Sequence, residues 1–247
     1  MASSLVRSLR ILEALARAPN GLSIAELAVI VDSPPSGTHR TVNELVEQGY
    51  VVQRASHENY CLSLKIPALG LTFLGRCGIS DLAQPELDRL AEFSEELVRL
   101  SVFDGKSQVW VAVSQGVKSG FKYDPSSEQG ARVSLLSANG TAFLSFIPDT
   151  EIINVLSAYN EDNEPLNLDE LGPLLKETRQ RGYAIAVNKC TQGMTAIAAP
   201  IRDDRGELIG TVSVAGPTYR IPEERIPPLA TELLKTAKNL GNLSSGS

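Results

Sequence analysis

Residues 25–54, AELAVIVDSPPSGTHRTVNELVEQGYVVQR, read as two short amphipathic helices joined by a turn with two consecutive prolines. Ser23 is placed as an N-cap and Glu26 as its capping-box partner, so the first helix is predicted to begin near Ser23. The prolines end this helix, because proline lacks an amide donor and restricts the residue before it. A second helix is predicted after Ser36. This order is typical of a helix-turn-helix that reads DNA.

The N-terminal half of the second predicted helix is polar and carries no acid before Glu44, while Val42, Leu45 and Val46 form its apolar stripe. Small hydroxyls beside an arginine suit hydrogen bonding to phosphates and base edges in a major groove. An ordinary helical hairpin with a polar surface is the alternative interpretation. The candidate DNA-binding residues of this helix are Ser36, Gly37, Thr38, Arg40, Thr41 and Asn43.

A β-hairpin is predicted directly after the second helix. Gly49 stands where a helix would end, and the segments 50–54 and 60–64 read as two strands around a polar tip. A β-hairpin directly after the recognition helix is called the wing of a DNA-binding domain. Arg54 and His57 would then lie near the sugar-phosphate backbone, although an exposed histidine is often only solvated.

Size and composition favour a protein of two domains. The chain has 247 residues, of which 43% are apolar, enough to bury one small and one medium core. The sequence shows neither an apolar run long enough to span a bilayer nor a signal segment, so we expect a cytoplasmic protein without membrane contact.

Three widely spaced cysteines and two histidines give no disulfide framework and no metal site. The sequence also lacks a P-loop and a dinucleotide fingerprint, so no cofactor is expected.

The net charge of −6 argues against nonspecific affinity of the whole chain for nucleic acid. In residues 1–68 six basic residues balance six acidic ones, so the first domain is neutral. DNA affinity would therefore come from specific side-chain contacts and from the two DNA-binding domains of a dimer.

Residues 66–76 connect the two predicted domains and are too apolar for a solvated linker. Leu69, Phe73 and Leu74 would cluster on one side of a helix. Such a stripe usually packs against a partner, here the second chain of a dimer. Packing on the chain's own second domain is the alternative.

The remainder of the chain predicts an α+β layer architecture. A long helix is expected from residue 81, followed by strands at 100–103 and 108–113 about the turn Asp104-Gly105-Lys106. Later strands are expected at 183–188, 194–201 and 208–215. Helices are expected near 138–146, 169–181 and 222–240.

Several segments of the chain resemble the IclR-type bacterial transcriptional regulators. They include LVRSLRILEALARAPNGLSIAELA, THRTVNELVEQGYV, SANGTAFLSFIPD and GMTAIAAPIRDDRGELIGTVSVAGP, in the order of that family. The resemblance implies a winged helix-turn-helix (1–66), a linker helix with dimer contacts (67–80) and a GAF-like effector-binding domain with an antiparallel sheet (81–247). It implies operator DNA, a small organic effector and a second copy as partners, in a homodimer or tetramer.

The effector is expected where a helix begins at SANGTAF. A helix N-terminus offers free amide donors and positive potential, so Ser137, Asn139 and Gly140 could hold a carboxylate or carbonyl. An ordinary capped helix is the alternative.

The resemblance places the effector between this loop and strands that carry Ala196 and Ser213. Compared with members that bind small polar oxoacids, residues here are less polar at several of the family's positions. The candidate effector-binding residues are Trp110, Leu135, Ser137, Asn139, Gly140, Thr141, Ala196, Ser213 and Ala215. With Trp110 as an aromatic wall, a larger and partly apolar effector is expected, such as an aromatic acid, ester or amide.

An enzyme and a structural adaptor are the alternative functions. Nucleophilic catalysis needs a positioned base, and both histidines lie in the N-terminal part of the chain. We therefore expect no catalytic residue. In an adaptor, the helix-turn-helix would bind protein instead of DNA.

Overall fold

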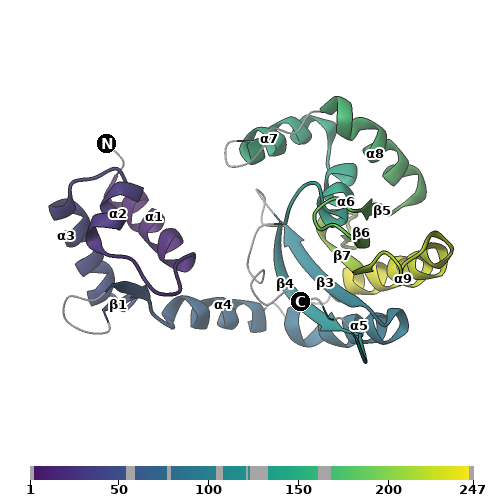
Figure 1. The fold of residues 1–247 in the computed structure, drawn as a ribbon, viewed down its shortest axis with the longest axis horizontal. Coiled ribbons are helices and arrows are strands. Elements are labelled where there is room, and N and C mark those ends of the chain that lie inside the picture. Colours follow the sequence, from purple (N-terminus) through teal and green to yellow (C-terminus); the bar gives the residue numbers. More distant parts are fainter. Residues whose placement is uncertain are drawn as a thin grey trace. The chain divides into compact units, whose positions relative to one another are not determined.

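The computed structural model describes residues 3–53, 59–76, 79–103, 108–120, 122, 133–160 and 168–244. The chain divides into two compact units, Met1–Arg76 and Cys77–Ser247 (Figure 1). Within the described ranges, every helix is too short or too polar to cross a bilayer.

The first unit is a helical domain with a small hairpin. Its core contains Ile11, Leu15, Leu27, Val42 and Tyr60, so all three N-terminal helices and the hairpin share one apolar centre. The two strands of the hairpin pair antiparallel, and a fourth helix follows the second strand in the chain. The elements are α1 (Ser4–Ala16), α2 (Ile24–Ile30), α3 (Pro35–Glu47), β1 (Val51–Gln53), β2 (Tyr60–Leu62) and α4 (Lys65–Arg76).

The second unit is built on a five-stranded antiparallel sheet with the strand order β4-β3-β7-β6-β5. This confirms the predicted α+β class. The strands are β3 (Leu97–Phe103), β4 (Gln108–Gln115), β5 (Ala184–Val187), β6 (Met194–Arg202) and β7 (Leu208–Pro217). The helices are α5 (Ile79–Ser94), α6 (Ala138–Phe146), α7 (Asp149–Asn160), α8 (Leu168–Arg181), the 3-10 turn η2 (Glu223–Arg225) and α9 (Ile226–Ser244).

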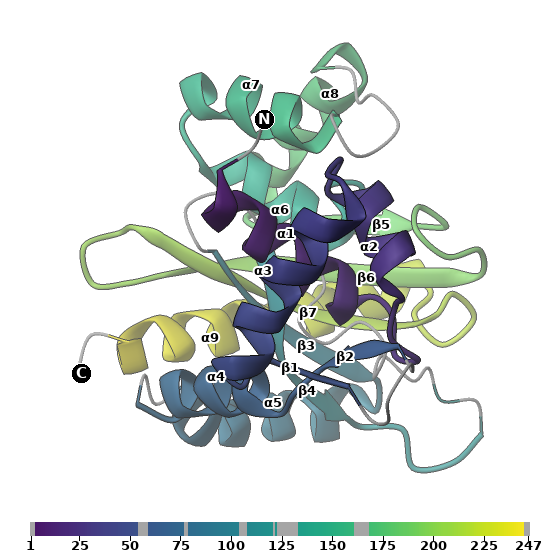
Figure 2. The same ribbon diagram turned by 90° about the vertical axis from the view of Figure 1, so that its left-hand side faces the viewer.

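Helices cover both faces of this sheet (Figure 2). On one face, α5 and α9 pack on Val98, Leu100, Val212 and Val214, which alternate along β3 and β7. On the other face lies α6, with α7 and α8 behind it. The α6 contact uses small residues, among them Ala138, Ala142, Ala184, Ala186 and Ala198. Because these side chains are short, the helix approaches the strands closely.

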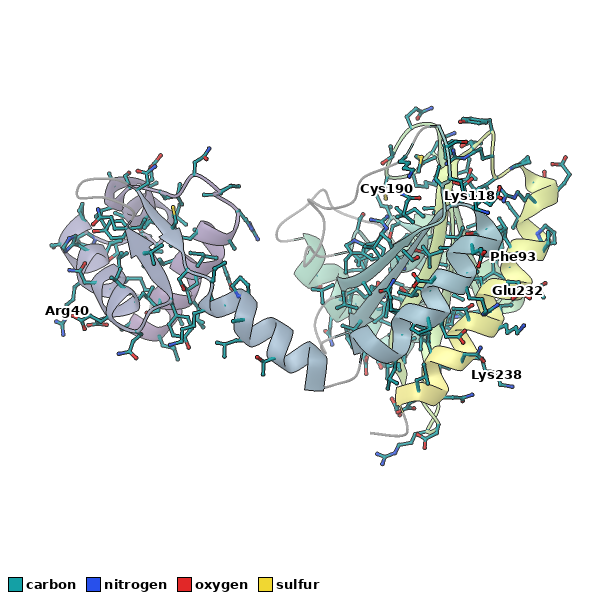
Figure 3. All side chains as sticks on the ribbon, turned by 90° about the horizontal axis from the view of Figure 1, so that it is seen from below. Arg40, Phe93, Lys118, Cys190, Glu232 and Lys238 are labelled. Carbon is teal, nitrogen blue, oxygen red and sulfur yellow. The ribbon has the colours of Figure 1, made fainter. Side chains whose placement is uncertain are left out.

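Ion pairs connect the helices and the sheet on the α5/α9 side. The guanidinium of Arg89 on α5 donates to the carboxylate of Glu232 on α9 at 2.7 Å, and the two helices run side by side (Figure 3). This bond holds the pKa of Glu232 below its usual range. Glu96, 1% exposed, accepts two bonds from Arg220, at 2.8 and 2.6 Å. Removing one partner of such a buried pair is strongly destabilising.

Two parts of the fold differ from the sequence-based expectation. Helix α7 was not predicted, and α9 begins at Ile226 because Pro222 is followed first by the turn η2. The predicted turn at 104–106 lies outside the described residues.

Candidate functional site

The helix-turn-helix is formed by α2 and α3, and its first helix begins as predicted. The hydroxyl of Ser23 accepts a bond from the amide of Glu26 at 3.3 Å, and the amide of Ser23 donates to the Glu26 carboxylate at 2.8 Å. Both bonds of the capping box are therefore present. The bonds that the Ser23 amide and hydroxyl donate to the Glu26 carboxylate hold the pKa of this carboxyl below its usual range. Pro34 is the N-cap of α3, which ends before Gly49 with φ of +74°.

Helix α3 buries the predicted side with Val42 and Leu45, and this side also includes two threonines that we expected to face DNA. Thr38 is 0% exposed and Thr41 is 3% exposed, and they lie on the same side of the helix as Val42 and Leu45. The hydroxyl of Thr41 donates to the carbonyl of Gly37. Both side chains pack inside the domain, so the structure does not present them on the surface where we predicted DNA contacts.

The exposed face of α3 carries Ser36, His39, Arg40 and Asn43. Their spacing of three, four and seven residues places them along one side of the helix. Arg40 is 84% exposed, projects from the unit (Figure 3), and pairs with Glu44 at 3.3 Å. Asn43 Nδ2 lies 3.3 Å from Nδ1 of His39. His39 was not among the predicted DNA-binding residues, although its spacing from Ser36 and Asn43 could have indicated it.

The remaining predicted DNA-binding residues differ in what the structure describes. Gly37 is half-buried on α3. Arg54 and His57 lie outside the described residues. Strands β1 and β2, which flank the predicted wing tip, pair as expected from Val51 to Gln53 and from Tyr60 to Leu62.

The second unit has a cavity of about 100 Å³ between the N-terminus of α6 and the sheet. Its alanine floor comes from three strands, and the loop between β5 and β6 forms one side. Cys190 lies in that loop (Figure 3). The lining residues are Arg99, Ser137, Ala138, Asn139, Ala186, Lys189, Cys190, Thr191, Met194, Ala196 and Ala215.

The α6 wall of the cavity is fixed by hydrogen bonds. The hydroxyl of Ser137 accepts from the amide of Gly140 at 3.0 Å and donates to the carbonyl of Ser134 at 2.6 Å. A side chain at Gly140 would collide with the backbone of Ser134 and Leu135, which explains the glycine. Asn139 donates to the hydroxyl of Thr211 at 2.7 Å, within a buried network. That network also contains Ser101 and Gln108.

The opposite wall carries a cation, Arg99, that was not among the predicted effector-binding residues. Cζ of Arg99 on β3 lies 4.0 Å from the centroid of the Trp110 ring, which is the geometry of a cation–π contact. Trp110 does not line the cavity itself, so it is a support for Arg99 rather than the aromatic wall that we expected. Strand alternation could have indicated Arg99, because its neighbours Val98 and Leu100 face the α5/α9 side.

Two family models match the chain and together span most of its length. The IclR helix-turn-helix domain matches residues 4–55, and the bacterial transcriptional regulator IclR C-terminal domain matches residues 71–242. The chain belongs to the IclR family.

Characterised and solved IclR-family proteins align over nearly the whole chain. The acetate operon repressor of Salmonella typhimurium is 28% identical over 245 residues, which are 96% of this chain and 88% of the repressor. An IclR family transcriptional regulator from Brucella abortus has a TM-score of 0.81 at 24% identity and covers 97% of this chain and 91% of its own. An IclR homolog from Microbacterium hydrocarbonoxydans, solved with 4-hydroxybenzoate, has a TM-score of 0.78 at 21% identity, covering 99% and 100%.

This IclR-family chain is a DNA-binding transcriptional regulator whose operator binding is controlled by a small organic effector. The two matched domains and the named repressors support this function, and they do not favour the enzyme or adaptor alternatives.

The structure separates the predicted effector residues of this IclR-family domain into two groups. Ser137, Asn139, Ala196 and Ala215 line the cavity. The others do not line it. Leu135 packs with Phe143 and Leu144 toward α7 and α8, and Thr141 is buried within α6. The backbone of Gly140 lies close to the backbone of Ser134 and Leu135, which leaves no room for a side chain. Ser213 is buried on β7.

The cavity is also smaller than expected. A volume of about 100 Å³ is below the range that is usual for drug-sized ligands. Two of the three floor alanines, Ala196 and Ala215, are predicted effector residues, and Ala186 was not predicted. Arg99 and Met194 also line this cavity. Their long side chains explain why the less polar residues did not give a large pocket.

Proposed function

We propose that the exposed face of α3 binds the major groove of operator DNA. The observation that carries this proposal is the row of polar side chains Ser36, His39, Arg40 and Asn43, on the side of α3 away from the buried threonines. Arginine and asparagine pair well with guanine and adenine edges, and histidine and serine add further donors. Arg54 and His57 of the predicted wing would contact phosphates.

We also propose that the protein acts as a homodimer or a dimer of dimers. Leu5, Leu9, Leu12 and Ala16 follow each other on α1 at intervals of four, three and four residues, as in the seam of a coiled coil. Leu5 is 69% exposed and Leu9 is 51% exposed within the single chain, whereas Leu12 is partly buried against the core that contains Ile11 and Leu15. A second copy would cover this stripe, and two α3 helices would then meet two half-sites.

The cavity beside α6 is our candidate for the effector site. Its alanine floor and Met194 suit an apolar body, while Ser137 and Asn139 offer hydrogen bonds. A compact organic molecule fits this space, and a single aromatic ring would be its largest body. Since the regulator must reach chromosomal DNA, we expect it to act in the cytoplasm.

Substitution of Arg40 tests the DNA-binding face. Arg40→Ala should weaken binding to an operator duplex by about 1–3 kcal/mol, roughly ten- to a hundredfold, while the melting temperature stays near the wild-type value. Arg10→Ala is the matched control, because Arg10 is an exposed arginine on α1 of the same unit. Equal operator titrations for wild type and Arg40→Ala would contradict the proposed face.

A further inference from the structure

The C-terminal end of α3 leaves carbonyl groups that need partners from another element. The helix ends in a Schellman motif around Gly49, in which the amides of Gly49 and Tyr50 donate to the carbonyls of Val46 and Leu45, each at 2.9 Å. The carbonyls of Gln48 and Gly49 lie beyond these bonds, so they must be satisfied from outside the helix.

Lys65 and Ser63, at the beginning of α4, supply these partners. Nζ of Lys65 donates to the carbonyl of Gln48 at 2.7 Å, and the hydroxyl of Ser63 donates to the carbonyl of Gly49 at 2.5 Å. The same hydroxyl accepts from the amide of Lys65, the first residue of α4, at 3.1 Å. One serine therefore bonds the end of α3 and the start of α4 together. The Lys65 charge also lies at the negative end of the α3 dipole.

Tyr50 holds the same two residues from the other side. Nζ of Lys65 lies 4.4 Å from the centroid of the Tyr50 ring, which is the geometry of a cation–π contact. The carbonyl of Tyr50 accepts from the amide of Ser63 at 2.9 Å. A single exposed hydrogen bond contributes little to stability, but these contacts share residues and together define one direction of α4 relative to α3. We call Ser63, Lys65 and Tyr50, with the carbonyls that they bond, the α3–α4 latch.

The direction of α4 matters because the chain leaves the DNA-binding unit along this helix. The first unit ends at Arg76, the last residue of α4, and the effector-binding unit begins at the next residue (Figure 1). In a dimer, the direction in which each α4 leaves its α3 limits where the two α3 helices can lie. Each base pair added between two half-sites rotates one of them by about 35° around the DNA axis. A fixed α4 therefore matches few spacings.

We propose that the α3–α4 latch sets the spacing between the two operator half-sites, and that Lys65 and Ser63 are positioning residues rather than DNA contacts. This inference rests on the proposed function, in which two copies read DNA through α3. The exposed row of polar side chains on α3 then reads the sequence of each half-site, whereas the latch determines how far apart the two half-sites lie.

A panel of duplexes with different spacers tests the latch. Each duplex carries two inverted copies of the half-site that wild type selects from random DNA, with spacers from zero to about 12 base pairs, slightly more than one helical turn. Wild type should bind its preferred spacer at least about tenfold more tightly than spacers about two base pairs longer or shorter. Lys65→Met and Ser63→Ala should each reduce this ratio to about threefold or less, because α4 is then free to adopt several directions.

The two variants separate geometry from charge. Loss of the Lys65 charge weakens the attraction to phosphates equally at every spacer. Ser63→Ala keeps the charge and breaks a different bond of the latch, so its affinity for a duplex with one half-site should stay within about twofold of wild type. Lys65→Arg keeps a cation and a donor and should retain the preference for one spacer.

Lys238→Met is the matched control, since it makes the same change at an exposed lysine on α9 of the second unit (Figure 3). It should leave the affinity for every spacer unchanged. Melting temperatures near the wild-type value would show that each variant is folded.

Two results would overturn the inference: a wild-type spacer preference in either latch variant, or a loss of affinity in Lys65→Met that is equal at every spacer and lowers the salt dependence, as expected for a phosphate contact. A different result would contradict the proposed function itself. If wild type binds two half-sites no more tightly than one, two copies do not read DNA together, and no spacing exists for the latch to set.

Discussion

Arg40 and Glu44 form an ion pair one turn apart on α3, with 3.3 Å between Nε and Oε1. Glu44 is exposed on the helix that we place in the major groove, so its carboxylate opposes the approach of phosphates. Glu44→Gln should strengthen operator binding roughly three- to tenfold at low salt, because it releases Arg40 and removes a negative charge. Fluorescence anisotropy titrations at several salt concentrations would measure this. Glu13→Gln, an exposed acid on α1, is the control. Unchanged or weaker binding of Glu44→Gln would argue against a groove-facing Arg40.

Removal of the buried Thr38 hydroxyl on α3 should leave DNA binding unchanged. The Thr38 hydroxyl is buried and has no hydrogen-bond partner among the described residues. Thr38→Val keeps the shape and removes the hydroxyl, so the free energy of unfolding should stay equal or rise by up to about 1 kcal/mol. Operator affinity should remain within twofold of wild type. A folded Thr38→Val protein that no longer binds DNA would restore the threonine as a contact residue.

The exposed stripe of α1 predicts the oligomeric state. Placing charges in it with Leu5→Glu and Leu9→Glu should weaken dimerisation at least tenfold in analytical ultracentrifugation, because two glutamates would face a second copy. Operator affinity should fall as well, because a monomer can no longer bind two half-sites at the same time. Ile153→Glu, an exposed apolar position on α7, serves as control. A double variant that dimerises like wild type would exclude α1 as the interface.

The capping box of α2 predicts an acid-dependent contribution to stability. The Ser23 amide and hydroxyl donate to the Glu26 carboxylate and hold its pKa below the usual range. Because the folded-state pKa lies below the unfolded one, the stabilisation is present above the unfolded pKa and is lost as pH falls through the folded pKa. Wild type should therefore be more stable than Glu26→Gln at neutral pH, and this difference should vanish in acid. Denaturant unfolding across pH measures it; a difference that does not vary with pH would contradict the assignment.

Local signals predicted those parts of the fold whose causes are local. The capping box of Ser23 and Glu26, the prolines before α3 and the glycine after it set the helix ends from within a few residues. Helix α6 was expected at the residues where it occurs, because its N-cap Ser137 is also a local feature.

Errors arose where packing decides between similar faces. In α3 the stripe of Val42, Leu45 and Val46 appeared sufficient, yet Val46 is exposed while Thr38 and Thr41 complete the buried side. Threonine occurs in both buried and exposed positions. The sequence pattern alone therefore could not show which side of the helix faces the core. Arg99 was missed because it stands inside an apolar strand segment, and only pairing with β4 and β7 shows what surrounds it.

In vitro selection from random DNA duplexes tests the central claim most directly, namely that two copies read DNA through the exposed face of α3. Wild-type protein should enrich a pseudo-palindrome with two half-sites separated by about one helical turn or a small multiple. Asn43→Ala should relax the preference at one position in both half-sites and leave the other positions unchanged. Enrichment of a single asymmetric site, or an identical selected sequence for wild type and Asn43→Ala, would contradict the account.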